Sequence, residues 1–182
     1  MQKTGLDMWA EIAEKGVSAL AGRISDAESI EIAEKYGTHN YSPIGVNIVR
    51  GEGAYVWDGS GKKYIDCVGA YSAVAHGHLN PAVINAIKEQ LSKVALTSRA
   101  YYTTEVALFL KGLAQYCDMD MVCPMNTGTE AIETCIKIAR KWGYKIKGVP
   151  DGKAEIIVCE ENFHGRSTTI VGFSSEKNYR DG

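Results

Sequence analysis

Met125-Asn126-Thr127-Gly128-Thr129-Glu130-Ala131 is the stretch that decides the fold class of this chain. The short apolar run 121–123 precedes it, and apolar residues recur at helical spacing after it. The sequence therefore predicts a strand, a tight turn and a helix. Such a helix start exposes unpaired N–H groups, Gly128 lets a phosphate approach the backbone, and Thr127 and Thr129 add hydroxyl donors. A plain helix cap is the alternative interpretation.

Composition restricts the class of protein. The 182 residues, 45% of them hydrophobic, suffice for one domain with a core or for parts of two. A net charge of -2 with scattered lysines and arginines argues against a nucleic-acid surface and favours small-molecule partners. No apolar run approaches the roughly 18 residues of a membrane span, and the acidic N-terminus does not resemble a transit peptide, so we expect a cytoplasmic protein without membrane contact. Apolar neighbours and the lack of a C-x-x-C pair predict buried, reduced thiols at Cys67, Cys117, Cys123, Cys135 and Cys159.

The N-terminal part predicts two helices followed by an antiparallel meander. The first helix covers 6–20, and the second begins at Ser25, whose Ser-x-x-Glu spacing is typical of a capping box, and ends near Gly37. A polar loop then carries Tyr41, which is equally compatible with a pocket residue and with a packed aromatic. Glycine-rich turns separate three short β-rich runs, which predict strands at 46–49, 54–58 and 63–67.

The middle of the chain predicts a loop of small residues and then two helices. The loop, 69–78, contains Tyr71 and two histidines. Because no carboxylate or cysteine stands at metal-ligand spacing beside these histidines, loop hydrogen bonding is favoured over metal binding. Asn80 caps a helix with proline at its first position. A further helix is expected at 104–116.

Near the C-terminus the run 154–159 is almost entirely apolar, as expected of a strand buried on both faces of a parallel sheet. The alternation of predicted strands and helices along the chain indicates an α/β fold. The polar segment 161–168 follows at the carboxyl end of this strand, where open α/β sheets bind ligands. It contains Phe163 and Arg166, which are candidates for ligand binding. The alternative is core packing for Phe163 and a surface ion pair for Arg166. A further short strand is expected at 169–173.

Several motifs are jointly specific and run from about Ser25 to Gly182: His39-Asn40-Tyr41 with Pro43, Tyr71 to Val74, Leu96 to Ala100, Met125 to Gly128 with Glu130-Ala131, Ala139 to Tyr144, and Asn162-Phe163 with Gly165-Arg166. The sequence resembles in these motifs the fold-type I, class III aminotransferases, which use pyridoxal 5'-phosphate, and most closely their ornithine-specific branch. Residues 1–24 lie outside the resemblance.

The resemblance implies roles for the residues around the helix start. Gly128 and Thr129 would donate to the cofactor phosphate, with Thr127 beside them. Phe163 would stack on the pyridine ring. These are the cofactor-binding residues that we expect.

It also implies a substrate site. Arg166 would bind the α-carboxylate as a planar bidentate donor. Tyr41 and Tyr71 would line the substrate pocket, and in the ornithine-specific branch tyrosines at these positions favour a substrate with a terminal amine. The alternatives within the family are acetylornithine and 4-aminobutyrate.

The enzymes of this family require a lysine that forms the Schiff base and an aspartate that faces the pyridine nitrogen. In the family, both residues come well after the Asn-Phe-x-Gly-Arg segment. We therefore expect no catalytic residue within this chain, and we expect it to be inactive by itself. A truncated enzyme, a split enzyme and a fragment that folds for other reasons are all compatible with this pattern.

The resemblance also sets the expected organisation and activity. Residues 1–75 would form the N-terminal segment and part of the small domain, and 76–182 the first half of the large cofactor-binding domain. The reaction would move the δ-amino group of ornithine to 2-oxoglutarate in a dimer, or with a complementary C-terminal chain. A non-catalytic half-domain that binds a phosphate compound or a partner chain is the alternative. A dinucleotide-binding domain is disfavoured because the turn lacks G-x-G-x-x-G.

Overall fold

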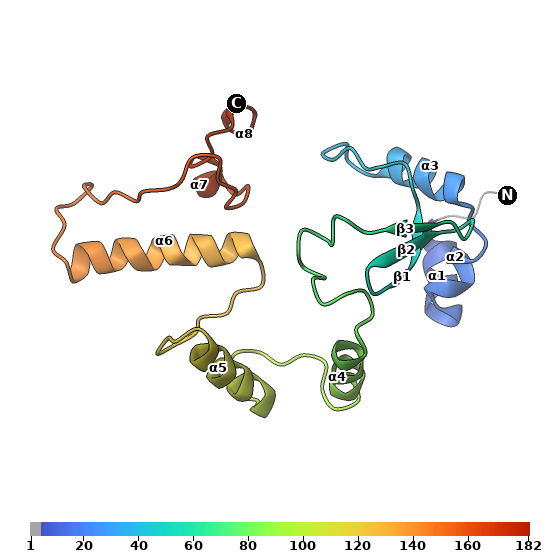
Figure 1. Cartoon of the computed structure of the whole chain (residues 1–182), viewed down its shortest axis with the longest axis horizontal. Coiled ribbons are helices and arrows are strands. Elements are labelled where there is room, and N and C mark those ends of the chain that lie inside the picture. The colour runs from blue at the N-terminus through green and yellow to red at the C-terminus, as the bar shows by residue number, and fades with distance from the viewer. Residues whose placement is uncertain (1–4) are drawn as a thin grey trace. The chain divides into compact units, whose positions relative to one another are not determined.

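The computed structural model describes residues 5–182. The chain divides into two compact units, Met1–Ser98 and Arg99–Gly182, coloured blue to green and green to red in Figure 1. The expected domain boundary near residue 75 concerns the complete fold and stays a prediction. Buried apolar side chains mark a small core in each unit, with Val56 in the first and Ile136 and Ile170 in the second.

Three helices open the first unit: α1 (Gly5–Lys15), α2 (Val17–Ala21) and α3 (Asp26–Tyr36). The single helix predicted over 6–20 is wrong, because Gly16 separates α1 from α2 with φ of +78°, a left-handed conformation that glycine adopts readily. The α3 prediction is confirmed. The Ser25 hydroxyl accepts the backbone N–H of Glu28 at 3.2 Å.

The predicted meander is confirmed as an antiparallel sheet in the order β1 (Ile48–Glu52), β2 (Tyr55–Asp58) and β3 (Lys63–Ile65). β1 starts later than predicted and continues through Glu52 into the expected turn, with an irregular register between Ile48 and Arg50. Asp26 ties α3 to the sheet. Its carboxylate accepts the Asn47 amide at 2.7 Å and the Gly59 backbone N–H at 2.9 Å.

Beyond the sheet, the loop 66–78 leads into α4 (Pro81–Leu91). As predicted, Asn80 caps this helix, since its side chain accepts the N–H of Ala82 at 3.0 Å. The two loop histidines make the expected loop hydrogen bonds. His78 donates to Asp66 at 2.7 Å, and His76 to the Gly77 carbonyl at 2.9 Å.

The second unit contains four helices within the described chain: α5 (Thr104–Tyr116), α6 (Gly128–Lys145), α7 (Thr168–Val171) and α8 (Lys177–Arg180). The α5 prediction is confirmed at both ends. The helix begins after Thr103, whose hydroxyl accepts the N–H of Val106. α6 confirms the helix predicted after the central turn, and it is eighteen residues long.

Three strand predictions in this unit are wrong. The segments 121–123 and 154–159 run without a ladder partner, and the described residues form one sheet only, the meander. A strand requires a neighbour to bond its backbone N–H and C=O groups, and an apolar sequence does not supply one. The predicted strand 169–173 instead includes the short helix α7, which packs against α6 through the unit core. No helix of the described chain is long and apolar enough to cross a membrane.

The expectation of buried thiols is also wrong. All five cysteines are free, as expected of reduced thiols, but all five are exposed. Cys123 and Cys159 belong to segments that were expected as strands, that of Cys159 inside a parallel sheet, and among the described residues neither segment has a strand partner. Apolar neighbours in sequence therefore do not bury a thiol unless the segment itself is packed.

Candidate anion-binding site at the start of α6

The start of α6 combines a helix cap with free donors. Thr127 is the N-cap residue: its hydroxyl accepts the N–H of Glu130 at 3.1 Å, and its own N–H donates to the Glu130 carboxylate at 2.9 Å. This reciprocal capping box satisfies two backbone N–H groups. Within the described chain, the N–H groups of Gly128 and Thr129 have no hydrogen-bond partner. They are the donors of this helix start that remain for an anion.

The cap and the anion site are therefore not alternatives. Thr127 and Glu130 complete the cap, while Gly128 and Thr129 keep their N–H groups at the positive end of an eighteen-residue helix. Glu130 thus has a capping role that was not predicted from its residue type. The Thr-x-x-Glu spacing from Thr127 was the signal that could have revealed it.

The segment after the second apolar run lies against this helix start. Gly165 adopts φ of +130°, and a Cβ atom at this position would collide with the Thr129 side chain. The chain therefore passes so close to the first turn of α6 that residue 165 has no room for a side chain. The loop that carries Phe163 and Arg166 therefore contacts the start of α6 through Gly165, which is 36 positions after Thr129 in the sequence.

Asn162 fixes the shape of that segment. Its amide donates to the carbonyl oxygens of Cys159 at 2.5 Å and Phe173 at 3.1 Å, and its side-chain oxygen accepts from His164 at 2.7 Å. Ser167 adds a hydrogen bond of 2.5 Å to Glu133 on α6. Sequence reasoning missed the positioning role of Asn162, because its amide donates to backbone carbonyl groups on both sides of the loop, and residue type does not reveal such partners.

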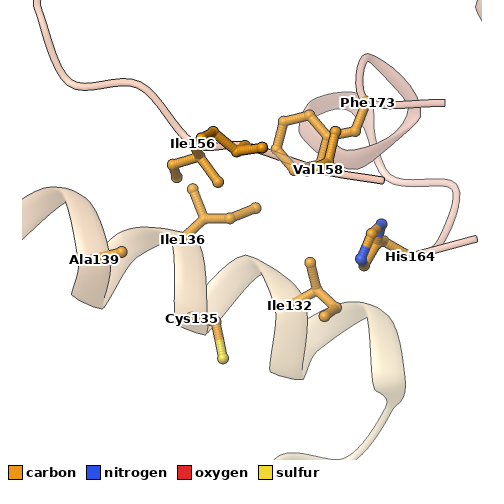
Figure 2. A pocket seen from close by; sticks show the side chains of 9 residues that line it. Ile132, Cys135, Ile136, Ala139, Ile156, Val158, His164 and Phe173 are labelled. Atoms are coloured by element: carbon orange, nitrogen blue, oxygen red, sulfur yellow. The ribbon is translucent and has the colours of Figure 1, made fainter. Parts of the chain in front are cut away.

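An apolar pocket of about 210 Å³ lies beside this site, between α6 and the extended segment that follows it (Figure 2). Ile136 points from α6 toward Ile156, Val158 and Phe173, and His164 closes one end next to Ile132. Phe163 and Arg166 do not line it. The pocket is the packing seam of the second unit, and the anion site lies at the helix start.

The seven predicted site residues fall into two groups. Thr127, Gly128 and Thr129 form the helix start, and Phe163 and Arg166, both exposed, flank the loop residue Gly165 that lies against Thr129. Tyr41 and Tyr71 belong to the first unit, and both are exposed. Within the second unit, the loop at Gly165 contacts the helix start at Thr129. The grouping of all seven residues in one site stays a prediction. Among the described residues, no three acidic, histidine or cysteine side chains cluster as metal ligands would.

Comparison with known proteins identifies relatives of this chain. The family model described as Aminotransferase class-III matches residues 36–182. The ornithine aminotransferase of Brevibacillus brevis is 49% identical over 153 residues, which cover 84% of this chain and 38% of the relative. The chain thus spans less than half the length of the relatives that it matches.

Two solved structures share the fold of this chain, and they are named for different amine donors. The ornithine aminotransferase of Toxoplasma gondii, described with partial occupancy of pyridoxal phosphate at its active site, aligns over 100% of this chain and 41% of its own, with a TM-score of 0.85 and 31% identity. The acetylornithine aminotransferase of Elizabethkingia anophelis aligns over 85% and 38%, with a TM-score of 0.73 and 49% identity.

Proposed function

The chain belongs to the class-III aminotransferases and has the N-terminal part of their fold, and from this membership we propose that the protein transfers the δ-amino group of ornithine to 2-oxoglutarate. Enzymes of this class depend on pyridoxal 5'-phosphate, and their substrates are an amino acid and a 2-oxo acid. The ornithine preference, the cofactor site and the roles of individual residues are the parts that we propose.

One observation carries the proposal: at the start of α6, two N–H groups, those of Gly128 and Thr129, have no partner among residues 5–182 and lie beside a completed cap. A phosphate group fits this arrangement, because it accepts hydrogen bonds and its negative charge is favoured at the positive end of a helix. The exposed face of Gly128 leaves space for it, since a Cβ built there meets no atom within 4 Å apart from its chain neighbours and the backbone of its own helix turn.

The other residues would complete the binding of cofactor and substrate. The Phe163 ring, two-thirds exposed, offers an apolar face for a planar pyridine. Arg166 would hold the α-carboxylate of the amino acid in a bidentate pair. Tyr41 and Tyr71 would line the pocket that receives the amine donor. When bound, the cofactor supplies an electron-accepting ring on which an amino group is exchanged for a carbonyl.

Acetylornithine is the second candidate for the amine donor. It is supported by the 49% identity with the acetylornithine aminotransferase of Elizabethkingia anophelis. An acetyl group on the α-amine removes the charge of that amine and leaves the δ-amine free for transfer, so a pocket that hydrogen-bonds the free α-amine discriminates against acetylornithine. The hydroxyl groups of Tyr41 and Tyr71 are therefore the place to test the preference.

The test compares amine donors. We expect the protein, purified natively with any chain that accompanies it, to form glutamate from 2-oxoglutarate faster with ornithine than with N-acetylornithine or 4-aminobutyrate. Tyr41→Phe and Tyr71→Phe should each reduce the preference for ornithine about tenfold, because each removes one hydrogen bond to the donor. Tyr116→Phe, at an exposed tyrosine at the end of α5, is the control and should leave the preference unchanged. An unchanged preference in both pocket variants would contradict the ornithine assignment.

A further inference from the structure

The loop that carries Tyr71 has an unusual backbone. Four consecutive residues, Gly69 to Ser72, have positive φ, with 48° at Ala70, 55° at Tyr71 and 73° at Ser72. The left-handed region brings Cβ close to the following carbonyl oxygen in every residue except glycine, so each of the three costs free energy. Such strain persists only where surrounding interactions hold it, and it occurs frequently at ligand-binding sites.

Apolar packing does not hold this turn. The Tyr71 side chain is 87% exposed, so it adds little packing of its own. A pocket of about 210 Å³ lies between the loop and the β1–β2 turn, where Val74 and Gly69 face Gly53 and Ala54. The hydrogen bonds inside the loop are local, such as Tyr71 N–H to the Val68 carbonyl at 3.0 Å and Val74 N–H to the Gly69 carbonyl at 3.2 Å.

A polar pair holds the two ends of the loop together instead. The Asp66 carboxylate accepts a hydrogen bond from His78 Nε2 at 2.7 Å. Its other oxygen accepts the N–H groups of Val68 at 3.0 Å and Gly69 at 2.9 Å, so it binds the residue at which the left-handed turn begins. The Gly69 N–H, followed by His78, lowers the pKa of Asp66 and keeps the carboxylate ionised at neutral pH.

The same pair is anchored to the sheet. His78 exchanges two backbone hydrogen bonds with Gly53, at 2.8 and 3.0 Å, and its ring lies against Gly51 so closely that a Cβ there would collide with it. The Asp66 N–H donates to the Ala54 carbonyl at 2.9 Å. The Asp66 and His78 side chains are only 17% and 26% exposed, so solvent screens their hydrogen bond less than that of an exposed pair.

We propose that Asp66 and His78 are positioning residues that close the 66–78 loop on the β1–β2 turn and thereby hold Tyr71 in its left-handed conformation, in which it selects the amine donor. The selecting role of Tyr71 rests on the function proposed above. The closure itself does not, because it follows from the contacts of this loop alone. The two parts are therefore tested by different measurements.

Hydrogen–deuterium exchange tests the closure. Asp66→Asn and His78→Leu should each make the amides of 67–77 exchange about tenfold faster, because a charge-assisted hydrogen bond that closes the loop is weakened or lost. His78→Gln keeps an N–H donor near the position of Nε2 and should keep slow exchange. Amides of α5 and α6 should be unaffected in every variant, which shows that the chain is folded.

Asp58→Asn is the matched control, because Asp58 also binds two backbone N–H groups, but in the β2–β3 turn. It should speed exchange at 59–64 and leave 67–77 unchanged. Unchanged exchange at 67–77 in Asp66→Asn and His78→Leu, or equal acceleration by His78→Leu and His78→Gln, would overturn the proposed closure.

The donor preference tests the second part. In the natively purified enzyme, Asp66→Asn and His78→Leu should raise KM for ornithine more than they change kcat, with His78→Gln close to the unsubstituted protein. Accelerated exchange together with an unchanged ratio of ornithine to N-acetylornithine activity would retain the closure and contradict the role of Tyr71 in the proposed function. A fall in kcat alone would contradict the positioning of a donor-binding residue.

Discussion

At the scale of single residues, Asp58 shows how a short turn depends on one charge. Its carboxylate accepts hydrogen bonds from the Ser60 hydroxyl at 2.6 Å, the Tyr64 hydroxyl at 2.7 Å and two backbone N–H groups at 3.0 Å. The Ser60 hydroxyl, followed by that of Tyr64, lowers the pKa of Asp58 to about 2 from an ordinary value of 3.8. The turn between β2 and β3 is therefore built around an ionised carboxylate.

This lowered pKa predicts a pH-dependent stability. Because the folded chain favours the ionised form, its contribution is complete above pH 3.8 and is lost as the pH falls through about 2. Asp58→Asn should lower the thermal unfolding temperature at pH 7, and the difference from the unsubstituted chain should shrink toward pH 2. Ser60→Ala removes the largest cause of the shift and should raise the pKa of Asp58 in an NMR titration. If the difference in unfolding temperature were the same at every pH, the charge of Asp58 would not contribute to stability, and the effect of Asp58→Asn would come from altered hydrogen bonding or packing.

The candidate site was also predictable residue by residue, but only in part. Thr127 to Glu130 carry their signal in local spacing, since a cap and its helix are neighbours in sequence. Gly165 and Asn162 acquire their roles from contacts with Thr129 and with the Phe173 carbonyl, which only the folded chain brings near. The type of residue at a loop position does not indicate which backbone groups will surround it.

At the scale of elements, helices were predicted better than strands. α4 and α5 begin at caps, Asn80 and Thr103, that the sequence places next to an apolar stripe, and such signals are local. The runs 121–123 and 154–159 have the composition of strands, but the described residues offer them no partner. At 169–173 the β-branched residues favoured a strand, and packing of Ile170 in a short helix overrode that preference.

Ile170 therefore provides a test at this scale. It is 1% exposed and lies in α7, a helix of four residues that cannot be stable without packing against α6. Ile170→Ala should destabilise the second unit by about 2–4 kcal/mol, as large-to-small core substitutions do. The measurement is urea unfolding, with hydrogen exchange to follow α7. Ile157→Ala, at a position that is 98% exposed, is the control, and an equal loss in both variants would show that α7 is not part of the core.

At the scale of the whole molecule, surface area is the informative quantity. The chain exposes 15,596 Å², whereas two compact bodies of half its mass would together expose about 10,000 Å². Much of the exposed surface is apolar: large side chains that are almost fully exposed include those of Leu96, Tyr102, Met121 and Ile157. Exposed apolar surface of this extent is typical of chains that associate.

We therefore predict that the protein is not a monomer in solution. Among the described residues, the segments 121–123 and 154–159 have no strand partner, so each offers an edge to which a further strand can add. Burying the exposed apolar side chains supplies the driving force. Native mass spectrometry of natively purified material, with denatured masses from the same sample, should show multiples of 19.8 kDa or a second polypeptide bound to this chain. Multiples of 19.8 kDa indicate a homo-oligomer, and a second mass indicates a complementary chain that completes the sheet. A single species of 19.8 kDa at micromolar concentration would contradict association, and the exposed apolar surface would then have to be covered within the chain itself.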